Sequence, residues 1–479
     1  MSSRPDSHVF RASGAHPGAE AVATPTLDDP NASSGAAATR LPTRRRWFML
    51  SLLLIATIIN YVDRVNISIA APFMAKDLGL DKVQMGLVFS AFAWTYAFAL
   101  VPAGFIADRF GSRFTYGFSL ISWSAVTVCQ GLAGGFASLF GLRLAVGALE
   151  APAFPANSRA VTVWFPARER GLASSIYVCG QYLGTALFTG LLLWLATTYD
   201  WRHVFYSTGI VGIVFGIAWL YLYRDPLNDK KVSPQELAYI EDGGGLVKSS
   251  QQRTRFNWRQ VAELFRYRQV WAICIGKFAS TSALYFFLTW FPTYLIEERH
   301  LTMVKVGIFA VLPFIGATIG ILLAGIVSDL MIRRGYSLSF ARKLPLVVGS
   351  MLGMSIVLVN FTDSNVLCIA VLTTAFFAQG IASASWAAVS EVAPKELIGL
   401  TGGITSLAAN IGGIITPIVI GWIVHETGNF SAAFWFIGGV ALIGTLSYSL
   451  LLGRLHRIVL QTRYGAGGLR LGHRPQANV

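Results

Sequence analysis

Five ionisable residues stand inside long apolar stretches of a chain that otherwise keeps its charges at the edges of such stretches. They are Asp63, Arg64, Arg143, Glu150 and Lys277. A charged side chain within hydrocarbon costs about 2.5–3.5 kcal/mol on insertion scales, so it marks a functional position by default. Buried acids can take up and release protons, and buried cations can bind an anion. We therefore expect these five residues to carry the chemistry of the protein.

Asp63 and Arg64 are neighbours in sequence, so on a helix their side chains point about 100° apart. We expect Arg64 to face a ligand and Asp63 to turn toward a neighbouring helix. Arginine suits an anion clamp, because its planar fork binds a carboxylate with two donors and stays charged when dehydrated. The alternative is an internal salt bridge from Arg64 to Asp63 or Glu150 that only sets the helix register.

Arg143 and Glu150 are seven residues apart and therefore lie on nearly one helix face, about 10 Å apart along the axis. Gly147 between them leaves room for another helix to approach. Such a face needs a polar cavity or charged partners. It is also compatible with a purely architectural pair, in which each residue neutralises some other helix.

Proton carriers follow by elimination, because the histidines all fall in tails, loops or span ends. Burial favours the neutral form of an acid and a nearby cation favours its charged form, so Asp63 and Glu150 can change protonation in a working cycle. Three cations beside two acids carry +1 when both acids are ionised and +3 when both are protonated. Proton uptake then strengthens anion binding, and by linkage the reverse also holds. The histidines are His8, His16, His203, His300, His425, His456 and His473.

The elements that hold these residues are membrane spans. The chain has 479 residues, of which 54% are hydrophobic and 13% charged. This composition is typical of an integral membrane protein and excludes an ordinary soluble enzyme. Runs of about 20 apolar residues, the length that crosses the hydrocarbon core, predict twelve transmembrane helices. They fall near 47–71, 84–106, 114–134, 137–158, 171–196, 201–223, 270–296, 303–330, 344–361, 365–389, 397–423 and 430–453.

Charge predicts the orientation of these spans. An even number of spans puts both tails on one side, and most of the 38 Lys and Arg residues fall on that side. By the positive-inside rule both termini are cytoplasmic. The net charge of +14 reflects this bias, which argues against a nucleic-acid partner. The few bases on the other side are Lys76, Lys82, Arg202, Arg299 and Lys305.

The predicted fold is all-α, with two six-helix bundles around a central cavity. The expected organisation is a disordered cytoplasmic N-tail (1–46), an N-terminal bundle (47–223), a cytoplasmic linker (224–269), a C-terminal bundle (270–453) and a cytoplasmic C-tail (454–479). In the linker, Ser233-Pro234-Gln235-Glu236 has the pattern of a helix start with a Ser cap and a Glu three residues later.

A repeated loop pattern links the two bundles. Each copy has a Gly, an Asp four residues later and then bases around another Gly, in the loop after the second span of its bundle. Glycine permits a tight turn, and Asp can accept from a helix N-terminus or an Arg, so the pattern predicts a gating latch. A solvated turn with ordinary charges is the alternative. The latch residues are Gly104, Asp108, Arg109, Gly111 and Arg113 in the first copy, and Asp329 and Arg333 in the second.

This pattern resembles the signature loop of the major facilitator superfamily. Asn60-Tyr61-Val62-Asp63-Arg64, the Arg143–Glu150 spacing, Pro152-Ala153-Phe154-Pro155-Ala156-Asn157 and Thr289-Trp290-Phe291-Pro292 resemble its anion:cation symporter branch, most closely bacterial sugar-acid carriers of the galactonate and glucarate type. The resemblance implies alternating access to a central site.

The resemblance also implies roles for individual residues. Positions matching Asp63 and Glu150 bind protons in such carriers, whereas Arg64, Tyr61, Tyr96 and Gln181 match residues for substrate binding or coupling. Lys277 departs from the neutral amide expected near it. A substrate with two carboxylates would use this second cation, unless its amine reaches the cytoplasmic surface instead. Further candidates for a polyhydroxylated ligand are Arg143, Tyr285, Ser385, Trp386 and Asn410, and the aromatic ones among them equally suit helix packing.

The sequence thus predicts a secondary transporter that imports an organic anion, most simply a sugar acid, with protons. The rivals are a carrier of another organic anion, such as an aromatic or tricarboxylic acid, and a sensor built on a carrier fold. No ATP-binding loop occurs, and spans without histidine argue against an enzyme or a metal site. We expect no cofactor besides the coupled proton, a monomer in the lipid bilayer, and a bacterial cytoplasmic (inner) membrane.

Overall fold

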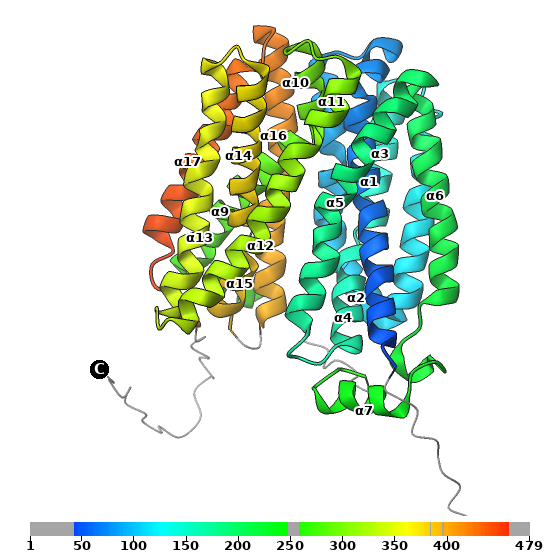
Figure 1. Cartoon of the computed structure of the whole chain (residues 1–479), viewed down its shortest axis with the longest axis vertical. Helices are drawn as coiled ribbons and strands as arrows, with labels where there is room; N and C mark the ends of the chain where they lie inside the picture. Colours follow the sequence, from blue (N-terminus) through cyan, green and yellow to red (C-terminus); the bar gives the residue numbers. More distant parts are fainter. Residues whose placement is uncertain (1–42, 248–257, 384, 395–396, 459–479) are drawn as a thin grey trace, which may run out of the picture. The chain divides into compact units, whose positions relative to one another are not determined.

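A computed structural model describes residues 43–247, 258–383, 385–394 and 397–458, and in these ranges the chain is helical without a strand (Figure 1). The N-terminal half comprises α1 (Arg45–Leu78), α2 (Lys82–Gln130), α3 (Phe136–Glu150), α4 (Ala153–Trp164), α5 (Arg170–Thr198) and α6 (Trp201–Leu222). Between the halves lie η1 (Pro226–Asn228), α7 (Pro234–Asp242) and α8 (Trp258–Leu264). The C-terminal half comprises α9 (Arg268–Thr289), α10 (Phe291–Glu297), α11 (Met303–Phe309), α12 (Val311–Arg333), α13 (Leu338–Gly353), η2 (Met354–Phe361), α14 (Asn365–Ala382), α15 (Ser385–Val392), α16 (Ile398–Thr427), α17 (Ser431–Leu446) and η4 (Ser447–Leu451).

Within the described ranges, 11 helices are long and apolar enough to cross a membrane. The one predicted span that is not among these 11 is the third, 114–134. It lies in the second part of α2, after a break at Gly111 where φ is +73°. Only glycine adopts this backbone conformation readily, so Gly111 joins the second and third spans in a tight turn. Gly335, its counterpart in the repeated loop, has φ +86° after α12.

Glycines let the helices of the N-terminal half approach closely enough to meet around the charged residues. A Cβ atom at Gly147 of α3 would collide with the backbone of Phe92 in α2. A Cβ at Gly184 of α5 would lie 2.8 Å from the Ile58 oxygen of α1. The backbones of α1, α2, α3 and α5 therefore pack directly, which brings the side chains that flank these glycines together.

The two halves meet at the ends of the helices that lie away from α7. A Cβ at Gly86 of α2 would lie 2.6 Å from the Pro417 oxygen of α16, and one at Gly421 would lie 2.5 Å from the Lys82 oxygen. Lys82 and Glu297 form an ion pair across the same junction. These contacts leave no space for a larger residue, so the halves are closed against each other at this end.

Near α7 the described polar contacts of the loops stay within one half. Arg113 donates to the Leu220 oxygen at the end of α6, from Nε at 2.8 Å and from Nη2 at 2.5 Å. In the C-terminal half, Arg342 of α13 lies 3.2 Å from Asp329 of α12 and donates to Ser328. Each half thus ties its own helix ends together on this side.

The predicted latch residues therefore lie in different environments. Arg113 caps a helix, Asp329 pairs with Arg342, and Arg109 and Arg333 are exposed. A Cβ at Gly104 would meet nothing within 4 Å, so this glycine is not required for a close approach. The side chain of Asp108 lies outside the described part of the structure. The latch itself remains a prediction.

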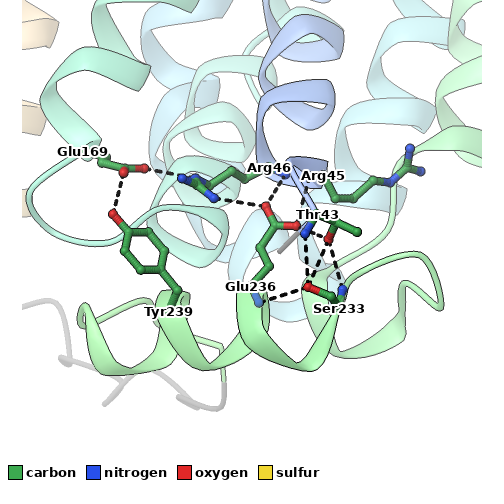
Figure 2. Close-up of polar contacts among 7 residues, drawn as sticks. All are labelled: Thr43, Arg45, Arg46, Glu169, Ser233, Glu236 and Tyr239. Carbon is green, nitrogen blue, oxygen red and sulfur yellow. Dashed lines mark hydrogen bonds and ion pairs between the residues drawn. The ribbon is translucent and has the colours of Figure 1, made fainter. Parts of the chain in front are cut away.

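Helix α7 is bound to the start of α1 through Glu236, which Figure 2 shows. Ser233 caps α7 by accepting from the Glu236 amide at 3.2 Å, as the sequence predicts. The Glu236 carboxylate does not close the local capping box. It accepts instead from the backbone amides of Arg45, at 3.0 Å, and of Arg46, at 3.1 Å. The N-cap residue of α1, Arg44, makes no side-chain cap, so Glu236 supplies the cap from another helix.

Arg46 extends this contact to a third element. Its guanidinium donates to Glu236 at 3.2 Å and to Glu169, just before α5, at 3.1 Å. Tyr239 of α7 donates to the same Glu169 at 2.7 Å. The linker helix is thereby fastened to the N-terminal half by charge-assisted hydrogen bonds (Figure 2).

Candidate functional site

An ion pair between Arg64 of α1 and Glu150 of α3 lies at the centre of the N-terminal half. Arg64 Nε and Nη2 lie 2.6 and 2.5 Å from one carboxylate oxygen, Oε1. The Glu150 side chain is fully buried, whereas the Arg64 side chain keeps 12% of its surface. The second oxygen, Oε2, has no hydrogen-bond partner among the described residues. Arg64 is thus held at one end by Glu150 and remains accessible at the other.

Three aromatic rings surround the Arg64 guanidinium. Its central carbon lies 4.8 Å from the ring centroid of Tyr61, 4.7 Å from that of Phe92 and 4.9 Å from that of Tyr96. Phe92 and Tyr96 are stacked on each other on α2, with centroids 5.1 Å apart. Ring faces attract a cation, so this box stabilises the guanidinium away from bulk water.

Arg143 lies beside the same box with fewer contacts. Its guanidinium carbon is 5.5 Å from the Phe92 centroid, and the residue is 3% exposed. Nε and Nη1 have no hydrogen-bond partner among the described residues. A buried cation with unused donors is poorly satisfied by the protein alone, so it favours an anionic ligand.

Asp63 points away from Arg64, toward the inside of the N-terminal half. Its Oδ2 accepts from the indole nitrogen of Trp123 in α2 at 2.9 Å, and the residue is fully buried. Neighbouring positions on α1 therefore place an acid and a base in two different environments. This is the arrangement that the 100° separation predicts.

Three candidates of the C-terminal half come from α9 and α16. Tyr285 of α9 is buried and lies near enough to Arg64 to interact with its charge. Lys277, two turns earlier on α9, is 7% exposed and donates to Thr405 of α16 at 3.4 Å. Asn410 of α16 is half-buried and donates to the Ser406 oxygen of its own helix. Lys277 is therefore inside the protein rather than at its surface.

The remaining candidates are less closely joined to the site. Gln181 of α5 is half-buried, and its backbone oxygen accepts from Thr185. Ser385 is buried next to Tyr448, which belongs to the interior of the C-terminal half. The side chain of Trp386 lies outside the described part. The structure thus brings Tyr61, Asp63, Arg64, Tyr96, Arg143, Glu150 and Tyr285 into one region and does not show Ser385 there.

Sequence reasoning missed several residues of this region. Phe92 lies beneath both arginines but carries no chemical signal, being one of 32 phenylalanines. Trp123 was overlooked as a donor, although an indole N–H in an apolar span needs a partner. Tyr182 of α5 donates to Gln379 of α14 at 3.3 Å and so joins the two halves. Polar residues within spans were the available signal for this last pair.

The chemistry open to this arrangement is the binding of ions and the exchange of protons. Among the described residues no group of His, Cys, Asp and Glu side chains could hold a metal ion. Two cations, two acids and three phenolic hydroxyls line one region. They can bind an organic anion, and they can exchange a proton for it.

Comparison with known proteins identifies the family. The family model of the Major Facilitator Superfamily matches residues 53–340 and 335–465. The D-galactonate transporter of Escherichia coli O6:H1 is 43% identical over 425 residues, which cover 87% of this chain and 98% of the relative. The "Probable galactarate/D-glucarate transporter GudP" of Bacillus subtilis (strain 168) is 42% identical over 429 residues, covering 88% and 94%.

A solved structure supports the fold. The crystal structure of a bacterial homolog of the human lysosomal transporter Spinster, in an inward-facing and occupied conformation, superposes with a TM-score of 0.63. The two sequences are 20% identical, and the match covers 85% of this chain and 92% of the other. The family and relatives are transporters and not enzymes, and the chain is a multi-pass integral membrane protein. It belongs to the major facilitator superfamily, in the group whose relatives are named for sugar-acid transport.

Proposed function

We propose that this protein imports a sugar acid together with protons by alternating access, with Arg64 as the clamp for the substrate carboxylate and Glu150 as the coupling acid. The observation that carries the proposal is the buried Arg64–Glu150 ion pair inside its aromatic box. A guanidinium that already holds a carboxylate in this place can hold a second one instead. The names of the relatives supply the substrate class.

The pairing gives a simple rule for coupling. While Glu150 is ionised it occupies Arg64, with Nε donating to Oε1 and Nη2 in ion-pair contact with the same oxygen. Protonation removes the charge of Glu150 and releases Arg64 for the substrate. Conversely, a bound substrate carboxylate competes for Arg64 and favours the protonated form of Glu150. Each ligand therefore strengthens the binding of the other, which is the thermodynamic condition for symport.

The same pair also explains why the empty carrier can move. With Glu150 on Arg64 the charges of the site are partly compensated without substrate. Breaking a buried pair by removing one partner costs about 3–5 kcal/mol, so the return step proceeds with the pair intact. Arg143, which has unused donors near Phe92, then adds attraction for the incoming anion.

The orientation follows from the positive-inside rule. The side that carries α7 is cytoplasmic, and the closed junction of Gly86, Pro417 and Gly421 is on the outer side. In this orientation the halves are closed outward, which is the arrangement that an inward-facing stage of the proposed cycle requires. The bacterial cytoplasmic membrane is the expected location, because these named relatives are bacterial.

The substrate preference depends on Lys277. A sugar acid with a carboxylate at each end would use a second cation, and a monocarboxylate would not. The buried position of Lys277 supports a role inside the carrier, and its contact with Thr405 places it between α9 and α16. We therefore favour an aldarate such as glucarate over galactonate.

Uptake into proteoliposomes tests the proposal. The panel is labelled galactonate, glucarate, glucuronate, phthalate and citrate, each with and without an imposed inward proton gradient. We expect accumulation of one sugar acid, and only under the gradient. Flux of phthalate or citrate alone would keep the fold and reject the sugar-acid assignment. Binding without flux would identify a sensor instead of a carrier.

A further inference from the structure

A second set of buried polar side chains lies inside the N-terminal half, behind the substrate site. On α2, Trp123, Thr127 and Gln130 lie at intervals of four and three residues, so they share one helix face, and all three are fully buried. Trp123 of this face contacts Asp63 of α1. We call Asp63, Asn66, Trp123, Ser124, Thr127, Gln130 and Thr208 the polar seam.

The seam is connected by hydrogen bonds at its inner end. Asn66 of α1 donates to the Thr208 hydroxyl of α6 at 3.1 Å. Thr208 in turn lies near the Asp63 carboxylate, whose Oδ1 atom has no hydrogen-bond partner among the described residues. An amide, a hydroxyl and a carboxylate from two helices therefore lie beside one another, and the Thr208 hydroxyl hydrogen is available to a water molecule or to the carboxylate.

The seam leads toward the end of the helices that lies away from α7. After the break at Gly111, α2 runs in that direction and ends at Gln130. Seven residues separate Trp123 from Gln130, which corresponds to about 10 Å of helix. The next residues form the loop that joins α2 to α3, in which Leu132 is exposed. Gln130 is thus the last seam residue before the surface.

Several polar atoms along this path have no protein partner among the described residues. They are the Asp63 Oδ1 atom, the Asn66 Oδ1 atom, both amide atoms of Gln130 and the Ser124 hydroxyl. All four residues are fully buried. A buried polar atom without a hydrogen bond costs about 1–3 kcal/mol, and native proteins satisfy nearly all such atoms. Since protein groups do not satisfy these atoms, water is the remaining partner.

Helix α6 approaches α2 along the same path. A Cβ at Gly209 would lie 2.7 Å from the backbone carbonyl oxygen of Ser124, and a Cβ at Gly212 would collide with the side-chain hydroxyl of Ser124. Small residues thus keep the α6 backbone against α2, with Thr208 next to this contact. Polar residues at membrane depth on closely packed helices are typical of proton relays.

We infer that the polar seam holds a file of water molecules that carries protons from the surface away from α7 to Asp63, by a route separate from the substrate site. The step needs no other reactant. A hydronium ion at the Gln130 end gives up a proton, protons shift along the water and the Thr208 hydroxyl, and the Asp63 carboxylate becomes a neutral acid. Thr208 takes one proton as it passes another on.

A proton on Asp63 acts on the site through charge. Glu150 and Arg143 are the charged groups near enough to Asp63 to interact with it. Neutralising Asp63 removes a negative charge beside Arg143, which strengthens the attraction of the site for an anion. The inference rests on the proposed proton symport and adds the entry route to it.

Thr208 offers a matched pair of variants. Thr208→Val replaces the hydroxyl with a methyl group at nearly the same volume, and Thr208→Ser keeps the hydroxyl. Gln130→Leu removes the polar groups at the far end of the seam. Thr189→Val on α5 is the control for loss of a buried hydroxyl elsewhere, because within the described ranges the Thr189 hydroxyl donates to its own helix, at the Thr185 backbone oxygen.

The experiment measures proton entry and substrate exchange in the same proteoliposomes. Proton entry on substrate addition is followed with an internal pH dye, and substrate exchange is measured as counterflow at equal pH. We expect Thr208→Val and Gln130→Leu to slow proton entry by about tenfold or more, which is ~1.4 kcal/mol in barrier. Counterflow should stay within about twofold of wild type, and D2O should slow proton entry more in the variants than in wild type. Thr208→Ser and Thr189→Val should behave as wild type.

Different failures have different signatures. If wild-type protein shows no proton entry with substrate, the proposed symport is wrong. If wild type is proton-coupled and Thr208→Val and Gln130→Leu leave proton entry unchanged, only the seam is wrong. An equal loss of proton entry and counterflow, without a larger D2O effect, would assign these residues a structural role and also overturn the inference. Thr208→Val is the milder change and decides the question if Gln130→Leu does not fold.

Discussion

The two halves of the molecule have the same repeated loop but very different interiors. The N-terminal half buries Asp63, Arg143 and Glu150, and holds the partly exposed Arg64, in contact with aromatic and polar side chains. The C-terminal half contributes Lys277 from its interior, together with neutral groups such as Tyr285. A symmetrical fold thus carries an asymmetrical distribution of charge. On the proposed function, this difference places charge exchange in the N-terminal half and substrate selection by Lys277 in the C-terminal half.

Because of this asymmetry, we expect a substitution at Arg64 to cause the largest loss of sugar-acid uptake. Arg64→Lys keeps the charge but loses the planar guanidinium, whose Nε donates to Glu150 and whose Nη2 has no hydrogen-bond partner among the described residues. We expect sugar-acid uptake to fall by about 100-fold, which is ~2.7 kcal/mol of transition-state stabilisation by the usual conversion.

The matched control for Arg64→Lys is Arg266→Lys, an exposed position just before α9. Initial rates of uptake in proteoliposomes check both variants. Near-normal uptake by Arg64→Lys would show that the site needs only a positive charge, and would remove the reason for assigning the clamp to the N-terminal half.

Lys277 tests whether the C-terminal half selects the substrate. Lys277→Gln removes a cation that suits a second carboxylate, and a charge-assisted hydrogen bond is worth about 1.5–3 kcal/mol. The ratio of glucarate to galactonate uptake should therefore fall by about tenfold or more. Lys305→Gln, at an exposed position on α11, is the control. An unchanged ratio would exclude Lys277 from substrate contact.

Substitution of Glu236 tests how much its contacts with α1 contribute to the stability of the N-terminal half with its docked linker helix. Glu236→Ala removes the cap of α1 and one partner of Arg46, so we expect a loss of about 1–3 kcal/mol in stability. The measurement is thermal unfolding in detergent, with Gln235→Ala on the exposed face of α7 as control. Equal melting temperatures for Glu236→Ala and wild type would mean that α7 is not held by this carboxylate.

The smallest expected effect on stability follows from a substitution at Tyr239. Its hydrogen bond to Glu169, with the negative charge of that carboxylate, raises the pKa of Tyr239 above its ordinary value of 10.0. Because the pKa of Tyr239 is higher in the folded protein than in the unfolded protein, the contact stabilises the docked helix fully below pH 10.0. This stabilisation is lost as the pH rises through the pKa of the folded protein.

The advantage of wild type over Tyr239→Phe in melting temperature should therefore shrink between about pH 9 and about pH 11. A difference that stays constant over this range would show that the Tyr239 hydroxyl does not contribute through its proton.

Much of the fold was predictable because each membrane span corresponds to a run of apolar residues in the sequence. The predicted boundaries of spans such as 201–223 and 303–330 agree closely with α6 and with α11 and α12. The run 270–296 is interrupted at Trp290, between α9 and α10, although Pro292 was a signal for a break. Local chemistry therefore predicts spans better than it predicts breaks within them.

The site was predictable in residue types but not in partners. Arg64 and Glu150 stand 86 positions apart, and their salt bridge was one of two readings that the sequence left open. Glu236 has the local pattern of a capping box, yet it caps α1, because a tertiary partner with free amides competes with its own helix. Phe92 had no distinguishing signal at all. Contacts between distant segments depend on helix packing, which periodicity does not encode.

Glu150→Gln is the most direct test of the account, because glutamine keeps the shape of glutamate and cannot release a proton. In proteoliposomes, we expect this variant to lose accumulation under an inward proton gradient while counterflow of the same sugar acid continues. Glu426→Gln, at an exposed glutamate near the end of α16, should retain both activities. Gradient-driven accumulation by Glu150→Gln at the wild-type level would contradict the account, since the coupling acid would then lie elsewhere.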